Sequence, residues 1–265
     1  MGNHIIIIAE IGINHNGDMA LARELIKHAK SCGCDIAKFQ LYSVEGLFPT
    51  GEIWAQGKNW YEEVKRTELD EDMARYLEQT CRAYEIEFMA SAFDLERLGW
   101  LESFGVKHHK IATRMNRNRE YINIVLSKGK ETFISCQNPD DIPLLVSDIP
   151  DRNRNKPVVP VKTLYCVPNY PTMYEEIHLK NVCFQGQETF QGEYSIFDGL
   201  SDHSKGITSG QIAISRGAKI IEKHFTLDKL SSKGPDHICS IEPPEMRTLV
   251  QFARDYEEIT YGERH

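Results

Sequence analysis

Two short stretches late in the chain combine residue types that can hold a metal ion. Asp202 and His203 stand in the first stretch, and Glu222 and His224 stand in the second. Each stretch ends an apolar run, at residues 194–197 and 219–221, that predicts a short strand. Two histidines at the ends of neighbouring strands could bind one divalent cation, whereas a single strand-end histidine is more often a hydrogen-bonded structural residue. Spacing alone leaves both interpretations open.

Two lysines stand inside predicted strands. Buried lysines are rare unless they are paired, so Lys38 and Lys110 are candidate ligands for an anion such as a phosphorylated substrate. The alternative is that each lysine lies beneath a helix and extends its ammonium group into water. Hydroxyl groups at neighbouring strand ends could donate to the same phosphate. These hydroxyl residues are Ser91, Thr113, Ser135 and Ser201.

Glu10 is a further candidate because it directly follows an apolar run. Burying this carboxyl group would be costly without a cation or a hydroxyl partner. The other histidines and tyrosines near strand ends lack such a pattern. From the residues alone we expect structural roles for His15, His108 and His109, and packing roles for Tyr165 and Tyr170.

Strand-like and helix-like segments alternate along the whole chain. The eight predicted strands cover residues 5–8, 35–40, 87–90, 109–112, 132–135, 158–165, 194–200 and 219–222. The predicted helices cover residues 18–33, 69–84, 94–104, 119–128, 140–147, 175–180, 205–216 and 243–261. Eight strand–helix units predict an α/β fold, a single-domain (β/α)8 TIM barrel over residues 1–265, with its active site at the carboxyl ends of the strands.

A doubly wound open sheet is the competing fold. That fold favours a glycine-rich turn after its first strand, and residues 12–17 do not match GxGxxG. Two polar segments, residues 44–67 and 185–193, interrupt the alternation. The first is longer than most barrel loops, so we expect it to be either a lid or a partner surface.

Composition narrows the class of protein. A formal net charge of −8 argues against a nucleic-acid partner or an anionic membrane partner. No apolar run approaches the ~20 residues of a membrane span. The 7 cysteines are an odd number and fall mostly inside predicted helices and strands, so we expect a reduced, cytoplasmic protein.

Seven motifs resemble the sialic acid (N-acetylneuraminate) synthase family and occur in the family's order. They are AEIGINHNG at residues 9–17, KFQ at 38–40, KIA at 110–112, YPT at 170–172, GLSDH at 199–203, IEKHFT at 221–226 and GPDH at 234–237. The resemblance implies a TIM barrel that condenses phosphoenolpyruvate with an open-chain sugar. In that reaction C3 of phosphoenolpyruvate attacks the aldehyde, water adds at C2, and phosphate leaves with C–O cleavage.

The resemblance also implies roles for individual residues. His203 and His224 would hold a divalent metal, typically Mn²⁺ with Mg²⁺ or Co²⁺ as alternatives, that polarises the aldehyde. Glu10 would handle a proton of the attacking water or of the aldehyde oxygen. Phosphoenolpyruvate would be bound by Lys38, Ser91, Lys110, Thr113, Ser135 and Ser201. The sugar would be bound by Gln40, Tyr170 and Asp236. The resemblance also implies a possible homodimer.

The chain departs from the family pattern on the sugar side. After the fourth strand the family reads Ser-Gly followed by an acid, whereas this chain has Thr113, Arg114 and Met115. We therefore expect a changed acceptor, with Arg114 or Arg117 meeting an acidic or phosphorylated sugar. Loss of activity is the other interpretation of the same changes. The chain also has no room for the antifreeze-like C-terminal domain that the family commonly carries.

Three functions remain open from the sequence. The first is a metal-dependent synthase of the sialic-acid type with an unusual acceptor. The second is another barrel aldolase or lyase that uses a metal. The third is a non-catalytic relative that binds phosphoenolpyruvate or a partner chain. Retention of both lysines and both histidines favours the first function over the third.

Overall fold

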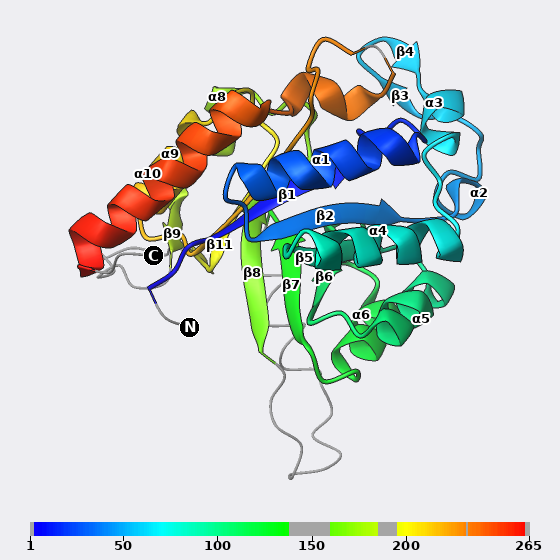
Figure 1. The fold of residues 1–265 in the computed structure, drawn as a ribbon, viewed down its shortest axis with the longest axis horizontal. Coiled ribbons are helices and arrows are strands. Elements are labelled where there is room, and N and C mark those ends of the chain that lie inside the picture. The colour runs from blue at the N-terminus through cyan, green and yellow to red at the C-terminus, as the bar shows by residue number, and fades with distance from the viewer. Residues whose placement is uncertain (1–2, 138–159, 185–194, 232, 263–265) are drawn as a thin grey trace.

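A closed barrel of eight parallel strands forms the centre of the molecule. The computed structural model describes residues 3–137, 160–184, 195–231 and 233–262 (Figure 1). The barrel strands are β1 (Ile6–Gly12), β2 (Ile36–Leu41), β5 (Glu87–Ala92), β6 (His108–Ile111), β7 (Glu131–Cys136), β8 (Val161–Cys166), β11 (Gly199–Asp202) and β12 (Ile220–His224). Around the barrel they run in the order β1-β12-β11-β8-β7-β6-β5-β2, and β2 closes onto β1. The predicted (β/α)8 fold is confirmed, and the open-sheet alternative is wrong.

Helices surround the barrel because each carries one apolar face. The longer ones are α1 (Met19–Ser31), α4 (Glu71–Ala83), α5 (Leu95–Phe104), α6 (Arg119–Leu126), α9 (Thr208–Ser215) and α10 (Pro243–Tyr261). Asp18, Asp70 and Asp94 begin α1, α4 and α5, because each carboxylate accepts backbone N–H bonds of the first turn. The apolar faces pack on the outside of the strands in one large cluster.

The inside of the barrel has two levels. Toward the amino ends of the strands it is filled by a small apolar layer. The layer consists of Ile8, Ile36, Met89, Phe133, Leu164 and Ile220. Toward the carboxyl ends the inward side chains are polar or charged, and they include Glu10, Lys38 and Lys110. The apolar layer therefore forms the floor beneath a charged pocket.

Two predicted segments differ in detail. The strand expected at residues 194–200 divides at Asp198, whose buried carboxylate accepts the backbone N–H of Thr163 at 2.8 Å. Its first part, β10 (Ser195–Phe197), pairs with β9 (Val182–Phe184) outside the barrel, and only β11 joins the barrel. The helix expected at residues 175–180 is α8 (Tyr174–Ile177), which ends where His178 adopts a left-handed conformation and η2 (Leu179–Asn181) follows. The helix predicted at 140–147 and the segment at 185–193 lie outside the described residues.

Residues 44–67 have structure of their own. They form α2 (Val44–Leu47), a hairpin of β3 (Trp54–Ala55) and β4 (Lys58–Asn59), and α3 (Tyr61–Lys65). A small apolar cluster holds this segment against the barrel. In Figure 1 the hairpin lies beside the segment that leads into α10, and the short helix η3 (Pro235–Cys239) belongs to that segment. None of the described helices is both long enough and apolar enough to cross a membrane.

Candidate active site

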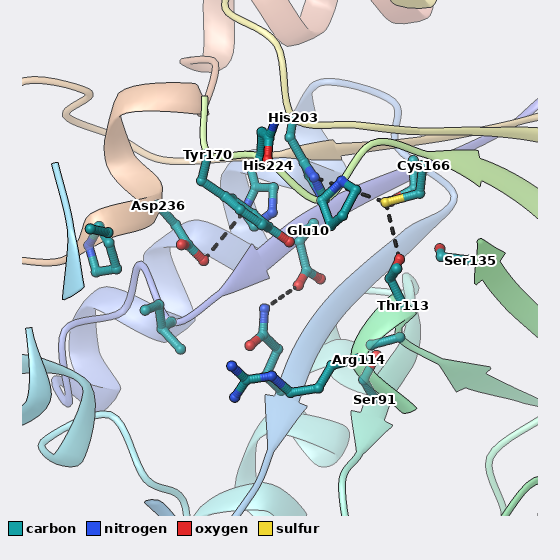
Figure 2. Close-up of a pocket in the computed structure, with 18 of the residues that line it drawn as sticks. Glu10, Ser91, Thr113, Arg114, Ser135, Cys166, Tyr170, His203, His224 and Asp236 are labelled. Carbon is teal, nitrogen blue, oxygen red and sulfur yellow. Dashed lines mark hydrogen bonds and ion pairs between the residues drawn. The ribbon is translucent and has the colours of Figure 1, made fainter. Parts of the chain in front are cut away.

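A pocket of about 990 Å³ opens at the carboxyl ends of the barrel strands. All thirteen residues predicted for substrate or metal binding line it. They are Glu10, Lys38, Gln40, Ser91, Lys110, Thr113, Arg114, Ser135, Tyr170, Ser201, His203, His224 and Asp236. The topology explains this convergence, because parallel strands in a barrel bring their carboxyl ends to one rim. Figure 2 shows Glu10 in the middle of the pocket, with the two histidines on one side and Arg114 on the other.

Four charged side chains form the base of the pocket. The Lys38 ammonium group donates to Glu10 at 2.7 Å and lies 3.5 Å from Glu222. The Lys110 ammonium group lies 3.8 Å from the other oxygen of Glu222. All four residues are at least 95 % buried, so the idea that either lysine extends into water beneath a helix is wrong. Pairing removes much of the cost of burying these charges.

This arrangement shifts the pKa values of the Glu10 and Glu222 carboxyl groups in opposite directions. Burial raises the pKa of Glu10, and the neighbouring Glu222 adds to the shift, although Lys38 opposes it. Burial would also raise the pKa of Glu222, but Lys110 and Lys38 outweigh it and lower that pKa to about 2. Glu222 therefore stays ionised between the lysines, whereas Glu10 can take up a proton more readily.

Hydroxyl groups surround the two ammonium groups. Lys110 donates to the Ser135 hydroxyl at 2.7 Å, and the Ser201 hydroxyl donates to Glu222 at 2.8 Å. Strand register explains the second contact, since Ser201 and Glu222 are cross-strand partners of β11 and β12. The Ser91 hydroxyl is buried without a hydrogen-bond partner among the described residues. A buried hydroxyl without a protein partner is available to donate to a bound oxyanion.

The two histidines lie side by side at the ends of β11 and β12. Their ring centroids are 5.3 Å apart, and the Tyr170 ring stacks on His203 at 4.0 Å. The Nδ1 atom of His203 lies 2.9 Å from the Val167 carbonyl oxygen. A carbonyl oxygen can only accept, so this contact assigns the proton to Nδ1 and leaves Nε2 free as a ligand atom.

The environment of His224 also suits a metal ligand. Burial lowers the pKa of His224 well below its usual value, and His203 adds to this effect, so the ring is neutral. Its Nδ1 atom is buried without a hydrogen-bond partner in the described parts of the chain. No cluster of three or more His, Cys, Asp or Glu side chains suited to a metal occurs among those residues. The pair supplies two imidazole nitrogens, so a divalent ion held there would need its remaining ligands from water or substrate.

Cys166 is a pocket residue that the sequence did not indicate. Its thiol accepts a hydrogen bond from Thr113 at 3.2 Å and lies 3.9 Å from Nδ1 of His203 (Figure 2). Burial would raise the pKa of Cys166, but His203 and Thr113 outweigh burial and lower it. The same contact raises the pKa of His203 against the opposing effect of its burial. A cysteine at the end of an apolar strand gives no signal that separates a pocket residue from a core residue.

Asp236, Gln40 and Tyr170 line the pocket from three different segments. The Asp236 carboxylate lies 3.7 Å from Nδ1 of His224, and burial with the neighbouring Glu10 raises its pKa to about 7. Gln40 donates to Glu10 at 2.8 Å. Tyr170 follows β8, and its stacking on His203 places it in the pocket wall, in contrast to the packing role expected from its residue type.

The remaining candidates have structural partners outside the pocket. His109 contacts Glu102 at 3.0 Å, and His108 contacts Glu131 at 3.2 Å. His15 is fully buried, and its Nδ1 accepts the N–H of Gly17. Tyr165 packs edge-on against Phe197. None of these side chains lines the pocket in the described part of the chain.

The segment 44–67 forms one wall of the pocket. Phe48, Ile53 and Trp54 line the opening, and Trp54 is 68 % exposed. At the tip of the hairpin, Gln56 donates to the Pro235 carbonyl oxygen at 3.0 Å and to the Tyr170 carbonyl oxygen at 3.4 Å. The segment therefore lies across the mouth of the barrel and is joined to the opposite side by these two bonds.

Fold and pocket together define a class: a (β/α)8-barrel protein with a deep, charged pocket and a histidine pair at its mouth. The chain belongs to the NeuB family, which it matches over residues 25–264. This confirms the family resemblance that the motifs indicated.

Named relatives cover almost all of the chain. It is 36% identical to the N,N'-diacetyllegionaminic acid synthase of Legionella pneumophila, over 96% of this chain and 72% of that protein. It is 33% identical to the human N-acetylneuraminate-9-phosphate synthase, over 94% of this chain and 69% of that protein. A crystal structure of a Leptospira borgpetersenii N-acetylneuraminic acid synthetase in complex with citrate superposes with a TM-score of 0.81 at 31% identity. The superposition covers 100% of this chain and 88% of the Leptospira chain.

Proposed function

We propose that this chain condenses phosphoenolpyruvate with an open-chain aldose to form a 2-keto sugar acid of the nonulosonic type, with release of phosphate. The observation that carries the proposal is the arrangement of one pocket. Two lysines surrounded by hydroxyl groups lie at its base, and two histidines lie at its side. The synthase names of the relatives support the same reaction class.

In this proposal the base of the pocket binds phosphoenolpyruvate. Lys38 and Lys110 supply positive charge, and the hydroxyl groups of Ser91 and Ser135 donate to the phosphate and carboxylate oxygens. The hydroxyl groups of Ser201 and Thr113, which donate to Glu222 and Cys166 in this structure, would turn to donate to the substrate when it binds. Charged donors placed in advance in a buried pocket would stabilise the charge of the substrate with little rearrangement.

Glu10 is placed to move the proton that the reaction needs. A bound trianion beside Glu10 favours its protonated form further, since its pKa is already raised. Glu10 then donates to the aldehyde oxygen as C3 of phosphoenolpyruvate attacks the aldehyde carbon. Water adds at C2, and phosphate leaves with the bridging oxygen. The sum is balanced: phosphoenolpyruvate, aldose and water give keto acid and phosphate.

His203 and His224 would hold a divalent cation, with Mn²⁺ as the expected ion. When bound, such an ion polarises the aldehyde carbonyl as a Lewis acid. The Val167 carbonyl oxygen fixes the His203 ring through Nδ1, and Tyr170 stacks against the same ring. Asp236 and Gln40 would position the hydroxyl groups of the sugar. All seven cysteines are free and buried, which supports a reduced, cytoplasmic setting.

The proposed reaction is tested by phosphate release. The protein is incubated with Mn²⁺, phosphoenolpyruvate and a panel of C5 and C6 aldoses, their N-acetylated forms and their anionic derivatives. We expect release that requires both the metal and a sugar. If phosphoenolpyruvate binds and no sugar elicits release, the chain is a non-catalytic binding protein. Sugar cleavage without phosphoenolpyruvate would identify a metal-dependent aldolase instead.

The histidine pair has its own test. We expect His203→Ala and His224→Ala each to abolish Mn²⁺ binding in titration calorimetry, because each change removes half of the protein's ligands. His109→Ala is the matched control, since His109 is equally buried but bonded to Glu102 outside the pocket. Unchanged Mn²⁺ affinity in both pocket variants would contradict the metal role.

A further inference from the structure

Arg114 presents a positive charge to the pocket. It belongs to η1 (Thr113–Met115), the short helix at the carboxyl end of β6. Its guanidinium carbon lies 4.4 Å from the centroid of the Phe48 ring. Figure 2 shows the side chain extended into the pocket, on the opposite side of Glu10 from His203 and His224.

Within the part of the chain that the structure describes, the Arg114 guanidinium has no anionic partner. No carboxylate of the described residues lies within 4.0 Å of it, whereas Glu10 and Glu222 both contact lysines. Burial lowers the pKa of Arg114, and of the neighbouring groups only Tyr170 acts in the opposite direction. Phe48 covers one face of the planar group, which leaves its N–H edges open to a ligand.

The surrounding charge favours an anion. Arg117, three residues further along the chain, also lines the pocket, and it too has no ion-pair partner among the described residues. Glu176 is another carboxylate that lines the pocket. It already accepts hydrogen bonds from the Asn169 amide and from the Met173 backbone N–H. Asp236 lies beside the histidine pair, 3.7 Å from Nδ1 of His224. Two arginines therefore line the pocket, and no carboxylate of the described residues is paired with either of them.

We propose that the acceptor sugar carries an anionic group, a phosphate or a carboxylate, at the end remote from its aldehyde, and that Arg114 binds that group. This rests on the proposed function, which places the aldehyde at the histidine pair. The fork of a guanidinium matches the paired oxygens of either anion, and a lysine would match them less well. Arg117 adds a second positive charge to the lining of the pocket.

The test compares three acceptors that differ only at C6. They are a 2-acetamido-2-deoxyhexose, its 6-phosphate and its 6-carboxylate, each assayed for phosphate release at saturating phosphoenolpyruvate and Mn²⁺. We expect kcat/KM to be about 10- to 100-fold higher for at least one anionic acceptor than for the neutral one, the range of one charge-assisted hydrogen bond. The two anionic acceptors distinguish phosphate from carboxylate.

Substitution of the arginine assigns the effect to one residue. Arg114→Gln should remove most of that preference while changing kcat/KM for the neutral sugar and the KM for phosphoenolpyruvate less than about threefold. Arg114→Lys should retain part of the preference because it keeps the charge and loses the fork. Arg82→Gln, on the exposed surface of α4, changes the net charge equally and should leave all three acceptors unaffected.

The outcomes are distinct. A native preference for the neutral sugar, or an equal loss for charged and neutral sugars in Arg114→Gln, overturns the inference and leaves the proposed function standing. A raised KM for phosphoenolpyruvate alone also overturns it, because Arg114 would then belong to the other substrate. If phosphate is released neither with these three sugars nor with any sugar of the wider panel, the proposed function and this inference are overturned together.

Discussion

Asp236 has a protonation state that its surroundings shift toward neutral pH. It is about nine-tenths buried, and its carboxyl group feels both the loss of water and the charge of Glu10. A folded-state pKa of about 7 lies above the usual value of 3.8, so the folded protein holds this proton more tightly than the unfolded chain does. The resulting stability is present at low pH and is lost as the pH rises toward 7.

The substitution Asp236→Asn tests this pKa shift through the pH dependence of stability. The variant lacks the cost of ionising Asp236, so its free energy of unfolding relative to the native protein should rise between pH 5 and pH 8. The expected change is roughly 2–3 kcal/mol. Urea denaturation of both proteins in metal-free buffer at the two pH values measures it. An equal difference at both pH values would show that Asp236 ionises normally.

At the scale of single residues, the sequence predicted much of the candidate site. Every predicted lining residue reaches the pocket, because strand-end position in a barrel determines where a side chain points. The pairing of Glu222 with both lysines was not predicted, since it depends on register between strands far apart in the sequence. Cys166 was missed because its contacts join the end of β8 to Thr113, which follows β6, and to His203, which follows β11.

Among the elements, β11 and β12 matter most because they carry the histidine pair. Behind the pocket, the fully buried Lys223 on β12 donates to Asp202 on β11 at 2.9 Å and to the Ser204 carbonyl oxygen. Ser209 on α9 donates to the same carboxylate at 2.6 Å. These bonds join the two strand ends to each other and to a helix, so they fix the positions from which His203 and His224 project.

Removing this lysine should destabilise the protein strongly. Lys223→Met leaves Asp202 buried without a cation, which we expect to lower the free energy of unfolding by about 3–5 kcal/mol. Lys27→Met is the matched control, because the Lys27–Glu24 pair is about half exposed and should contribute less than about 1 kcal/mol. Urea denaturation compares the two variants with the native protein. Equal small losses would mean that the buried pair contributes no more than a surface pair.

Element boundaries were predicted less well than element types. The strand expected at residues 194–200 was divided by Asp198, whose hydrogen bond to Thr163 is a tertiary contact that no local pattern reveals. The segment 44–67 could not be assigned, because its small apolar cluster forms only against Ile13 and Tyr42 of the barrel. Its position across the pocket mouth follows from Gln56 contacts with residues more than a hundred positions away.

Over the whole molecule, barrel closure depends on close contact between neighbouring strands. Gly199 opens β11, and its Cα faces Ile220 of β12. A Cβ atom on Gly199 would lie 2.0 Å from the Ile220 carbonyl oxygen, and that backbone oxygen cannot move without disturbing the strand pairing. Only glycine fits at this point of the barrel.

Gly199→Ala should therefore weaken the whole fold. We expect a loss of about 3 kcal/mol or more in the free energy of unfolding, at the upper end of overpacking effects. Gly99→Ala is the matched control, since Gly99 lies in the exposed face of α5 with no atom within 4 Å of an added Cβ. That control should gain about 0.5–1 kcal/mol from helix propensity. A tolerated Gly199→Ala would contradict the tight approach of β11 and β12.

The fold as a whole was predictable because its signal repeats eight times. Strand–helix alternation and the absence of a dinucleotide-type glycine turn were enough to favour a closed barrel over an open sheet. The seven motifs then indicated the family that the comparisons confirm. This signal did not identify the acceptor sugar, because Thr113, Arg114 and Met115 depart from the family pattern that carries the signal.

The most direct test of the central claim follows the bridging oxygen of phosphoenolpyruvate. The protein, Mn²⁺, an N-acetylated aldose or its 6-phosphate, and phosphoenolpyruvate labelled with ¹⁸O between C2 and phosphorus are incubated, and both products are analysed by mass spectrometry. We predict one 2-keto sugar acid for each phosphate, with the label in the phosphate. Label retained in pyruvate or in the keto acid, or phosphoenolpyruvate left unconsumed with every sugar, would contradict the proposed condensation.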